Sequence, residues 1–416
     1  MTAAPLLPAG FDFTDPDLNA VGVPHEEFRI LRASAPVTWV EQTENARAGQ
    51  SESSGTGYWA LTKHADVAAA SKNSAVFSSR ENGVIIRNPE TATVESVEMT
   101  KVVIINQDAP DHTALRRIIS RGFTPRAIAA LEEGLEEVAQ RIVREAVAAE
   151  AGDFVDQVAA QFPLEVIGDM LGVPAEDRQK IFAWTNQMTG ADDADLARAD
   201  NDPAAAAAEI LMYSMGLAAD RRESPRDDIV TKLVNADVDG RGLTDDEFGF
   251  FVIALAVAGN ETTRNATTHG MQAFFDHPDQ WDLWVKDRPA TMVDEVIRWA
   301  TPVTSFQRTA LEDVEVGGVQ IKAGQRVGLF YASANHDEEV FDDPFTFDIT
   351  REKNPHLAFG GHGAHYCIGA NLARTEIKLI FDALADLAPD IVGDGAAARM
   401  RSGWLNGVKS LPVRYR

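Results

Sequence analysis

Apolar residues recur three and four positions apart along most of this chain, which is the spacing of amphipathic helices. From Asp108 onward the pattern dominates, and it predicts a mostly helical protein. Asp202 and Pro203, followed by five alanines, form an expected N-cap and first turn. The helices that we expect cover residues 24–33, 64–72, 112–119, 125–150, 161–172, 175–188, 204–222, 244–278, 292–301 and 370–380.

The longest regular segment begins with a capping box formed by Thr244 and Glu247. The helical pattern then runs to Pro278, which is about thirty residues or roughly 45 Å. Because the segment is apolar on all sides through Ala258, we expect it to cross the interior. Residues 258–263 (Ala-Gly-Asn-Glu-Thr-Thr) then break the helix. Either these polar groups are buried and need partners, or the helix becomes exposed there.

A few short segments have the character of strands. Residues 37–40 and 58–61 are rich in aromatic and β-branched side chains, and residues 314–321 form a hairpin pattern around two glycines. A further turn between strands is expected at 403–407, and residues 81–99 have no steady period and suit a loop that closes over a ligand. The predicted fold is mainly α with a small β portion. We expect one domain over residues 1–416, with an irregular N-terminal segment of about 20 residues.

Composition and charge narrow the classes of function. The 416 residues carry a net charge of −26, and the isoelectric point near 4.7 argues against nucleic acid and anionic membranes as partners. The longest apolar run, residues 248–258, is too short to span a membrane, and no signal sequence is visible in residues 1–30. We therefore expect a cytoplasmic protein, which the presence of one cysteine also fits.

That cysteine, Cys367, lies among glycines at 360, 361, 363 and 369 and just before a predicted helix. Glycine permits close backbone approach, so the loop can fold tightly around the sulfur and leave it facing a flat partner, and a helix N-terminus stabilises a thiolate. The alternative is a buried small hydrophobe in a glycine turn. Another alternative is a zinc site formed by His362, His365 and Cys367, although zinc usually takes ligands from two separated segments.

Residues 359–369 (Phe-Gly-Gly-His-Gly-Ala-His-Tyr-Cys-Ile-Gly) resemble the haem-binding loop of the cytochrome P450 superfamily. The resemblance implies that Cys367 is the proximal ligand of the haem iron, a thiolate that favours O–O cleavage. The family's phenylalanine stands seven residues before the cysteine, where this chain has Gly360, and Phe359 comes one place earlier. The family pattern therefore does not define how Phe359 packs on the loop.

The same resemblance recurs in chain order over roughly residues 20–412. Residues 258–262 match the oxygen-activation motif of the long central helix that crosses the haem. Glu295 and Arg298 match a structural Glu-x-x-Arg pair that works with an arginine of a later loop. The resemblance implies that His112, Arg116, Arg308 and His365 bind the haem propionates. The other haem-binding residues that it implies are Cys367, Gly361 and Ala258.

A narrower resemblance points to a substrate. Residues 81–87, 181–188, 256–265, 306–310 and 359–371 are similar to the actinobacterial steroid side-chain monooxygenases. The resemblance implies hydroxylation of the terminal methyl (C26 or C27) of cholesterol or cholest-4-en-3-one. A sister group, the omega-hydroxylases of methyl-branched lipids, is the alternative enzyme, and a haem-binding sensor or carrier is the alternative that is not an enzyme.

The resemblance also implies roles for further residues. Thr262, with Glu261 behind it, would deliver protons to oxygen as a general acid. A large alicyclic substrate needs apolar walls, for which ordinary core positions are the alternative reading. The expected lining residues are Ile85, Ile86, Val257, Val303, Phe306, Trp404 and Leu405.

The implied cofactor is haem b (a heme with a cysteine thiolate ligand), with O2 and with electrons from NAD(P)H through a ferredoxin reductase and a ferredoxin. Four arginines and no acid lie between His112 and Leu131 (residues 116, 117, 121 and 126), an unusual patch in so acidic a chain. This patch, with Arg374 and Lys378, is either a solvated face or the docking surface for an acidic ferredoxin. We expect a monomer.

Overall fold

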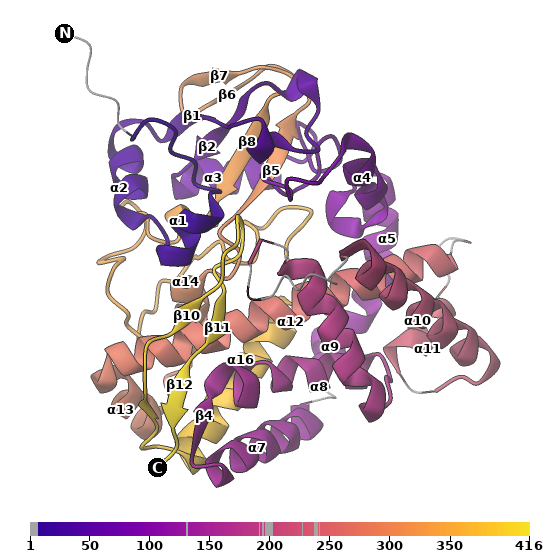
Figure 1. Ribbon diagram of the computed structural model, residues 1–416, viewed down its shortest axis with the longest axis vertical. Helices are drawn as coiled ribbons and strands as arrows, with labels where there is room; N and C mark the ends of the chain where they lie inside the picture. Colours follow the sequence, from indigo (N-terminus) through magenta and orange to yellow (C-terminus); the bar gives the residue numbers. More distant parts are fainter. Residues whose placement is uncertain are drawn as a thin grey trace.

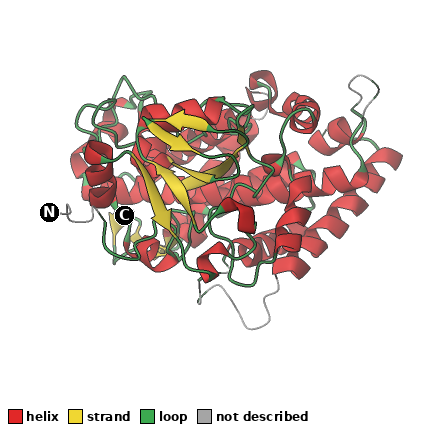
Figure 2. Cartoon of the chain, turned by 90° about the horizontal axis from the view of Figure 1, so that it is seen from above, coloured by secondary structure: helices red, strands yellow, loops and turns green. Residues whose placement is uncertain are grey.

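Helices make up most of the molecule and the largest sheet lies at one end of it (Figure 1). This computed structural model describes residues 7–129, 132–190, 192–193, 195, 203–226, 228–236, 240 and 242–416. Seen from above, the strands gather on one side and the helices extend away from them (Figure 2). The prediction of a mainly α fold with a small β portion is confirmed, and the single domain over 1–416 stays a prediction.

The predicted helices are found close to their ranges, and the structure describes further helices that the pattern did not indicate. The α-helices are α1 (Pro16–Val21), α2 (His25–Ser34), α3 (His64–Lys72), α4 (Val94–Met99), α5 (Asp111–Ile119), α6 (Pro125–Ala129), α7 (Glu132–Ala148), α8 (Gln161–Met170), α9 (Ala175–Thr189), α10 (Pro203–Glu223), α11 (Ile229–Val234), α12 (Asp245–Asp276), α13 (Pro278–Asp287), α14 (Met292–Ala300), α15 (Tyr331–Ala334) and α16 (Ala370–Leu387). Short 3-10 turns are η1 (Asn45–Arg47), η2 (Glu52–Ser54), η3 (Thr100–Val102), η4 (Ile104–Asn106) and η5 (Ser120–Phe123), and η6 (Val155–Ala159) is a π-helical turn.

The strands form one five-stranded sheet in the order β1-β2-β8-β5-β3 and three smaller sheets. Within the large sheet only β2 and β8 are parallel. The predicted hairpin at 314–321 is confirmed as β6 and β7. The strands are β1 (Val37–Glu41), β2 (Gly57–Leu61), β3 (Phe77–Ser78), β4 (Ala151–Asp153), β5 (Ser305–Ala310), β6 (Val314–Val316), β7 (Val319–Ile321), β8 (Arg326–Phe330), β9 (Val392–Gly393), β10 (Ala398–Arg399), β11 (Val408–Ser410) and β12 (Pro412–Arg414).

Three sequence-based expectations need correction. The N-terminal segment is not wholly irregular, because Asp15 caps α1, and residues 94–99 of the expected loop form α4 behind a capping box at Thr93. The central helix α12 is not broken at residues 258–263 but continues through them. The expected N-cap Asp202 lies outside the described residues.

Helix α12 is the structural axis of the helical side. Its capping box is present, since the Thr244 hydroxyl accepts the Glu247 N–H at 3.1 Å and the Glu247 carboxylate accepts the Thr244 N–H at 3.0 Å. The largest buried cluster surrounds α12, and in it Phe274 packs edge-on against Phe381 of α16 at 5.3 Å. Because α8, α9, α14 and η6 also pack against α12, every polar residue in its middle is set among other elements.

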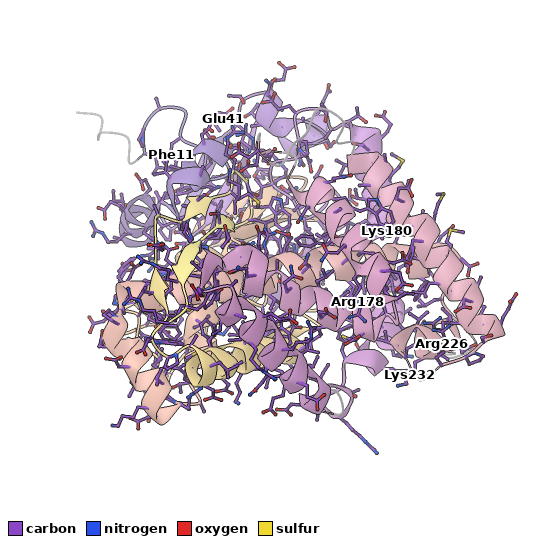
Figure 3. All side chains as sticks on the ribbon, turned by 60° about the horizontal axis from the view of Figure 1, so that its bottom comes forward. Phe11, Glu41, Arg178, Lys180, Arg226 and Lys232 are labelled. Carbon is purple, nitrogen blue, oxygen red and sulfur yellow. The ribbon has the colours of Figure 1, made fainter. Side chains whose placement is uncertain are left out.

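Charged side chains cover the outer helices. Arg178 and Lys180 of α9, with Arg226 and Lys232, lie on the helical side, far from Phe11 and Glu41 near the large sheet (Figure 3). Arg178 joins α9 to α8 by ion pairs with Glu165 and Asp169. In the part of the chain that the structure describes, no helix is both long and apolar enough to cross a membrane.

Candidate functional site

The cysteine loop is held by a close approach of its backbone to the end of α3. A Cβ on Gly363 would lie 1.8 Å from the Ser71 carbonyl oxygen, so only glycine fits there. Gly361, which the sequence assigned to the cofactor, has φ of +70°, and a Cβ on it would meet the Ser71 side chain at 2.7 Å. The two glycines thus fix the loop on α3, and the Cys367 N–H donates to the Phe359 carbonyl at 2.9 Å.

Phe359 packs on this loop despite its shifted position. Its ring lies edge-on to Tyr366, the residue before the cysteine, at 6.2 Å. The Arg374 guanidinium lies over the same ring at 4.6 Å, a cation–π contact. The extra residue, Gly360, is accommodated by a backbone φ of +94°.

The Cys367 side chain is both surrounded and accessible. Burial raises the pKa of its thiol, while the Gly369 N–H and the charges of Arg116 and Arg374 oppose that rise. The side chain is nevertheless solvent-accessible. The sulfur is therefore surrounded by protein atoms and still accessible to solvent, so it faces a space inside the fold. A flat ligand in that space would lie against the sulfur.

Helix α12 presents an accessible stripe in a buried setting. Ala254, Ala258 and Thr262, each four residues apart, are partly or fully accessible, whereas Glu261 and Thr263 beside them are buried. The Thr262 hydroxyl donates to the Ala258 carbonyl at 2.5 Å, which satisfies it without interrupting the helix. Three of the four polar residues of this segment, Asn260, Glu261 and Thr263, are therefore buried, and the alternative of a helix that becomes exposed there is wrong.

Glu261 is a fully buried carboxylic acid next to that stripe. Its Oε2 accepts the Arg264 Nη2–H at 2.5 Å, one turn further along the helix. Burial raises the pKa of Glu261, and the Arg264 charge opposes the rise. A carboxyl whose protonated form is favoured by burial suits a group that gives and takes protons.

Two histidines and two arginines from distant segments converge near the cysteine. The rings of His112 (α5) and His365 (cysteine loop) lie 4.1 Å apart. Burial and the charges of Arg308, His112 and Arg116 lower the pKa of His365 to about 2. Burial and the charge of Arg116 lower the pKa of His112 to about 4. The Ser79 hydroxyl lies 3.1 Å from His365 Nε2, a contact that no sequence pattern indicated.

This cluster fits an anionic ligand. Arg116 donates to the Tyr366 carbonyl and Arg308 to the Gln307 carbonyl, and burial lowers the pKa of both arginines. Asp108 is the acid that acts on His112 and Arg308, and it accepts hydrogen bonds from Ser78 and Ser79. Buried cations need counter-charge, which the two propionates of a haem would supply while its iron met Cys367.

Glu295 and Arg298 form a buried core pair rather than a surface pair. Both side chains are 0% exposed, and the guanidinium donates to the carboxylate through Nε and Nη2, both at 2.8 Å. Arg298 also donates to the carbonyls of Asn335 and Pro344, each at 2.9 Å. Arg351, which the sequence analysis left unnumbered, completes the cluster at 3.1 Å from Glu295.

The seven apolar candidates separate into two groups. Ile86 and Leu405 are buried, and Ile86 packs in a core cluster with Tyr58 and Phe330, which is the ordinary-core alternative. Leu405 forms a β-bridge with Val303. The half-buried members are Ile85, Val257, Val303, Phe306 and Trp404. The rings of Phe306 and Trp404 stack at 6.1 Å.

The basic patch is partly neutralised. Arg117, Arg121 and Arg126 are exposed, but Arg374 pairs with Asp294 at 2.8 Å and Lys378 pairs with Asp382 at 2.6 Å.

The zinc alternative finds no support in the residues that the structure describes, because they contain no group of three His, Cys, Asp or Glu side chains able to hold a metal. His362 stacks on Tyr366 at 4.9 Å, whereas the His365 ring contacts His112 at a tilt of 40°.

Comparisons with known proteins agree on one family. Residues 290–384 match the family model described as Cytochrome P450. A steroid C26-monooxygenase of Rhodococcus jostii is 57% identical, over 100% of this chain and 86% of the relative. A methyl-branched lipid omega-hydroxylase of Mycobacterium tuberculosis is 42% identical, over 93% and 90%. A solved Mycobacterium marinum cytochrome P450 in complex with pseudoionone superposes with a TM-score of 0.90 at 36% identity, covering 100% of both chains.

Proposed function

The chain belongs to the cytochrome P450 family of haem-thiolate monooxygenases, and from this premise we propose that it hydroxylates the terminal methyl of a sterol side chain. The expected substrates are cholesterol and cholest-4-en-3-one, oxidised at C26 or C27. The observation that carries the proposal is the 57% identity to a steroid C26-monooxygenase, against 42% to the methyl-branched lipid omega-hydroxylase. The omega-hydroxylase activity is the alternative.

Haem, held through a cysteine thiolate, supplies the activation of O2, one atom of which enters the substrate C–H bond while the other leaves as water. We assign the thiolate to Cys367. His112, Arg116, Arg308 and His365 are assigned to the propionates, because two guanidinium cations and two imidazole rings come together beside the cysteine loop. In this assignment Gly361 holds the loop against α3, and Ala258 presents an accessible face of α12 to the cofactor.

Thr262 and Glu261 are assigned to proton delivery. The Thr262 hydroxyl lies on the accessible stripe of α12, and Glu261 lies beside it in the buried interior. Thr262 donates to the Ala258 carbonyl at rest. Rotation of its side chain would direct the hydroxyl toward oxygen and let Glu261 replace the proton, a general acid role.

Half-buried apolar side chains support a large hydrophobic substrate. Ile85, Val257, Val303, Phe306 and Trp404 are enclosed but not fully buried, as expected of residues that line an internal space. They come from four separate parts of the chain, so a substrate among them would contact both the sheet and α12. We assign Ile86 and Leu405 to the packing behind that wall.

The family requires a redox partner, and we assign this role to a ferredoxin reduced by NAD(P)H. The exposed Arg117 lies in α5, which also bears the propionate candidates His112 and Arg116, and the exposed Arg121 and Arg126 follow this helix. A basic surface close to the cofactor suits an acidic electron donor. We expect a monomer in the cytoplasm, where both the ferredoxin and an unpaired cysteine are maintained.

The test is the absorbance spectrum of the haem-loaded protein, reduced and exposed to carbon monoxide, after titration with cholest-4-en-3-one. We expect the strongly red-shifted Soret band of a thiolate–haem complex, its loss in Cys367→Ser, and a low-to-high-spin shift with the steroid. A shift with a methyl-branched lipid and none with the steroid would favour the alternative. A protein that binds no haem would refute the whole assignment, and one that binds haem without turnover would be a sensor or carrier.

A further inference from the structure

The buried middle of α12 has more polar atoms than its protein partners satisfy. Among the described residues, no hydrogen-bond partner is found for Asn260 Oδ1, Glu261 Oε1, Arg264 Nε or Asn265 Nδ2, all of them buried. Buried polar atoms in native proteins are nearly always paired, and ordered water serves where protein groups do not. Four such atoms within two turns of one helix indicate a place where water is held next to the relay residue Glu261.

Arg264 connects this polar segment to the neighbouring helix α9. Its Nη2 pairs with Glu261, and its Nη1 lies 3.5 Å from the Asn186 Oδ1 of α9. The π-helical turn η6 packs directly on α12, and the charge of Arg264 acts on the pKa of Asp156 in that turn, lowering it against the rise that burial causes. A polar connection thus runs from Glu261 through Arg264 toward η6. Such π-helical turns occur often at functional sites.

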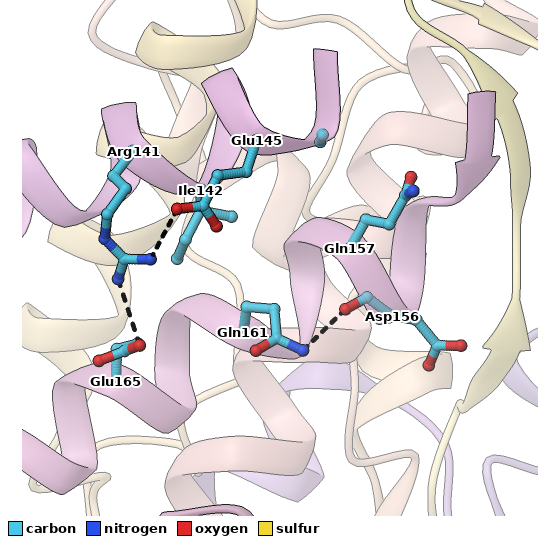
Figure 4. A pocket seen from close by; sticks show the side chains of 8 residues that line it. Arg141, Ile142, Glu145, Asp156, Gln157, Gln161 and Glu165 are labelled. Carbon is cyan, nitrogen blue, oxygen red and sulfur yellow. Dashed lines mark hydrogen bonds and ion pairs between the residues drawn. The ribbon is translucent and has the colours of Figure 1, made fainter. Parts of the chain in front are cut away.

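Asp156 lies at the edge of a surface groove between α7, η6 and α8 (Figure 4). On the α7 side of this groove Arg141 bridges Glu145 and Glu165 at 3.3 and 3.2 Å, which occupies both carboxylates. The Asp156 side chain points away from that bridge. It is exposed, and the described residues form no ion pair with it. One carboxylate of the groove is therefore free to exchange protons with solvent.

Gln157, the neighbour of Asp156, also lines the groove, and its amide lies against Gly152 of β4. Because η6 packs on α12, the groove lies on the solvent side of this turn and the buried polar segment lies on its inner side.

We propose that the protons used at Thr262 enter at this groove, with Asp156 as the outer carboxylate, Glu261 as the inner one, and water between them held by Asn260 and Arg264. The proposal rests on the relay proposed above. Each turnover takes up two protons, which leave in the water molecule. Asp156 takes each proton from solvent and passes it inward, which restores the negative charge of its carboxylate. Arg264 is not deprotonated, and its role is to orient Glu261 and the water.

The experiment compares Asp156→Asn with Glu145→Gln in the haem-loaded enzyme. Both changes remove one carboxylate of the same groove, but Glu145 lies on the far side of the Arg141 bridge. The first readout does not depend on turnover. It is the pH midpoint of the infrared carbonyl band of Glu261, which is identified by its loss in Glu261→Gln. Loss of the Asp156 charge strengthens the hold of Arg264 on Glu261, so Asp156→Asn should lower the midpoint, and Glu145→Gln should leave it unchanged.

The second readout is product formed per NAD(P)H consumed. A direct general acid contributes ~10²-fold or more to the rate. Water can partly replace an outer carboxylate as the proton donor, so we expect a smaller loss of yield, about tenfold, for Asp156→Asn. Asp156→Glu, which keeps a carboxylate, should retain the yield. If Asp156→Asn keeps the wild-type yield, or if Glu145→Gln shows the same losses as Asp156→Asn, the groove is not the entrance and the proposal fails.

The failure of the relay itself would look different. If Glu261→Gln and Thr262→Ala leave the product yield unchanged, the relay proposed above is wrong and the entrance fails with it. If those two variants lose yield and Asp156→Asn does not, only the entrance is wrong.

Discussion

Replacing Glu295 by glutamine should destabilise the protein far more than a change of one atom suggests. Five donors converge on this carboxylate: Arg298 Nε and Nη2 at 2.8 Å, the Asp348 N–H at 3.0 Å, and Arg351 Nε and Asn354 Nδ2 at 3.1 Å. An amide offers one oxygen and turns an NH2 group toward two or three of these donors. It also leaves Arg298, which is 0% exposed, without its counter-charge.

Breaking a buried ion pair on one side costs about 3–5 kcal/mol. Because a whole domain is stable by only about 5–15 kcal/mol, Glu295→Gln should remove a large fraction of the stability. The assay is urea unfolding of the haem-loaded protein, followed by far-ultraviolet circular dichroism and by haem absorbance. We expect a clear fall of the transition midpoint at unchanged slope.

The chain contains a matched control for this change. Glu26 and Arg29 in α2 are spaced as Glu295 and Arg298 are, three residues apart, and they form the same two-bond contact at 2.8 and 2.6 Å. Both of these side chains are more than half exposed, and exposed pairs contribute little, so Glu26→Gln should leave the midpoint unchanged. A loss below about 1 kcal/mol for Glu295→Gln, or equal losses for both variants, would refute the argument from burial.

Three further predictions follow from the site and its surroundings. Thr262→Ala should keep the thiolate–haem spectrum but lower the product formed per NAD(P)H by about tenfold or more, and an unchanged yield would disprove the hydroxyl's role. The rings of His25 and His336 lie 4.3 Å apart, and burial and neighbouring arginines such as Arg298 lower the pKa of both, that of His25 from 6.5 to about 4. Only the unfolded chain then binds these protons as the pH falls below 6.5, so stability should decline between pH 6.5 and 4, by up to about 1.4 kcal/mol per pH unit for each histidine. His25→Phe should flatten that decline in urea titrations at several pH values, and an identical profile would contradict the assignment. Arg121→Glu should slow reduction by ferredoxin most at low salt, and stopped-flow rates equal to the wild type at every salt concentration would leave that face without a role in docking.

Sequence reasoning succeeded where the signal is local. The helix over residues 64–72 and the hairpin at 314–321 have the bounds that the pattern predicted, because periodicity and turn chemistry are set by neighbouring residues. The error at α12 arose from treating a glycine and hydroxyls as a break. The packing of α8, α9 and η6 around the helix and the hydrogen bond of Thr262 to Ala258 keep the helix continuous.

The helices, the small β portion and the glycine-rich segment around Cys367 can be recognised from neighbouring residues alone. How the chemistry is arranged depends on the tertiary structure. Ser79 meets His365 across 286 positions of chain, and Glu295 and Arg298 become a core cluster through Arg351. Burial and charge pairing depend on which distant segments pack together, and no local pattern records that.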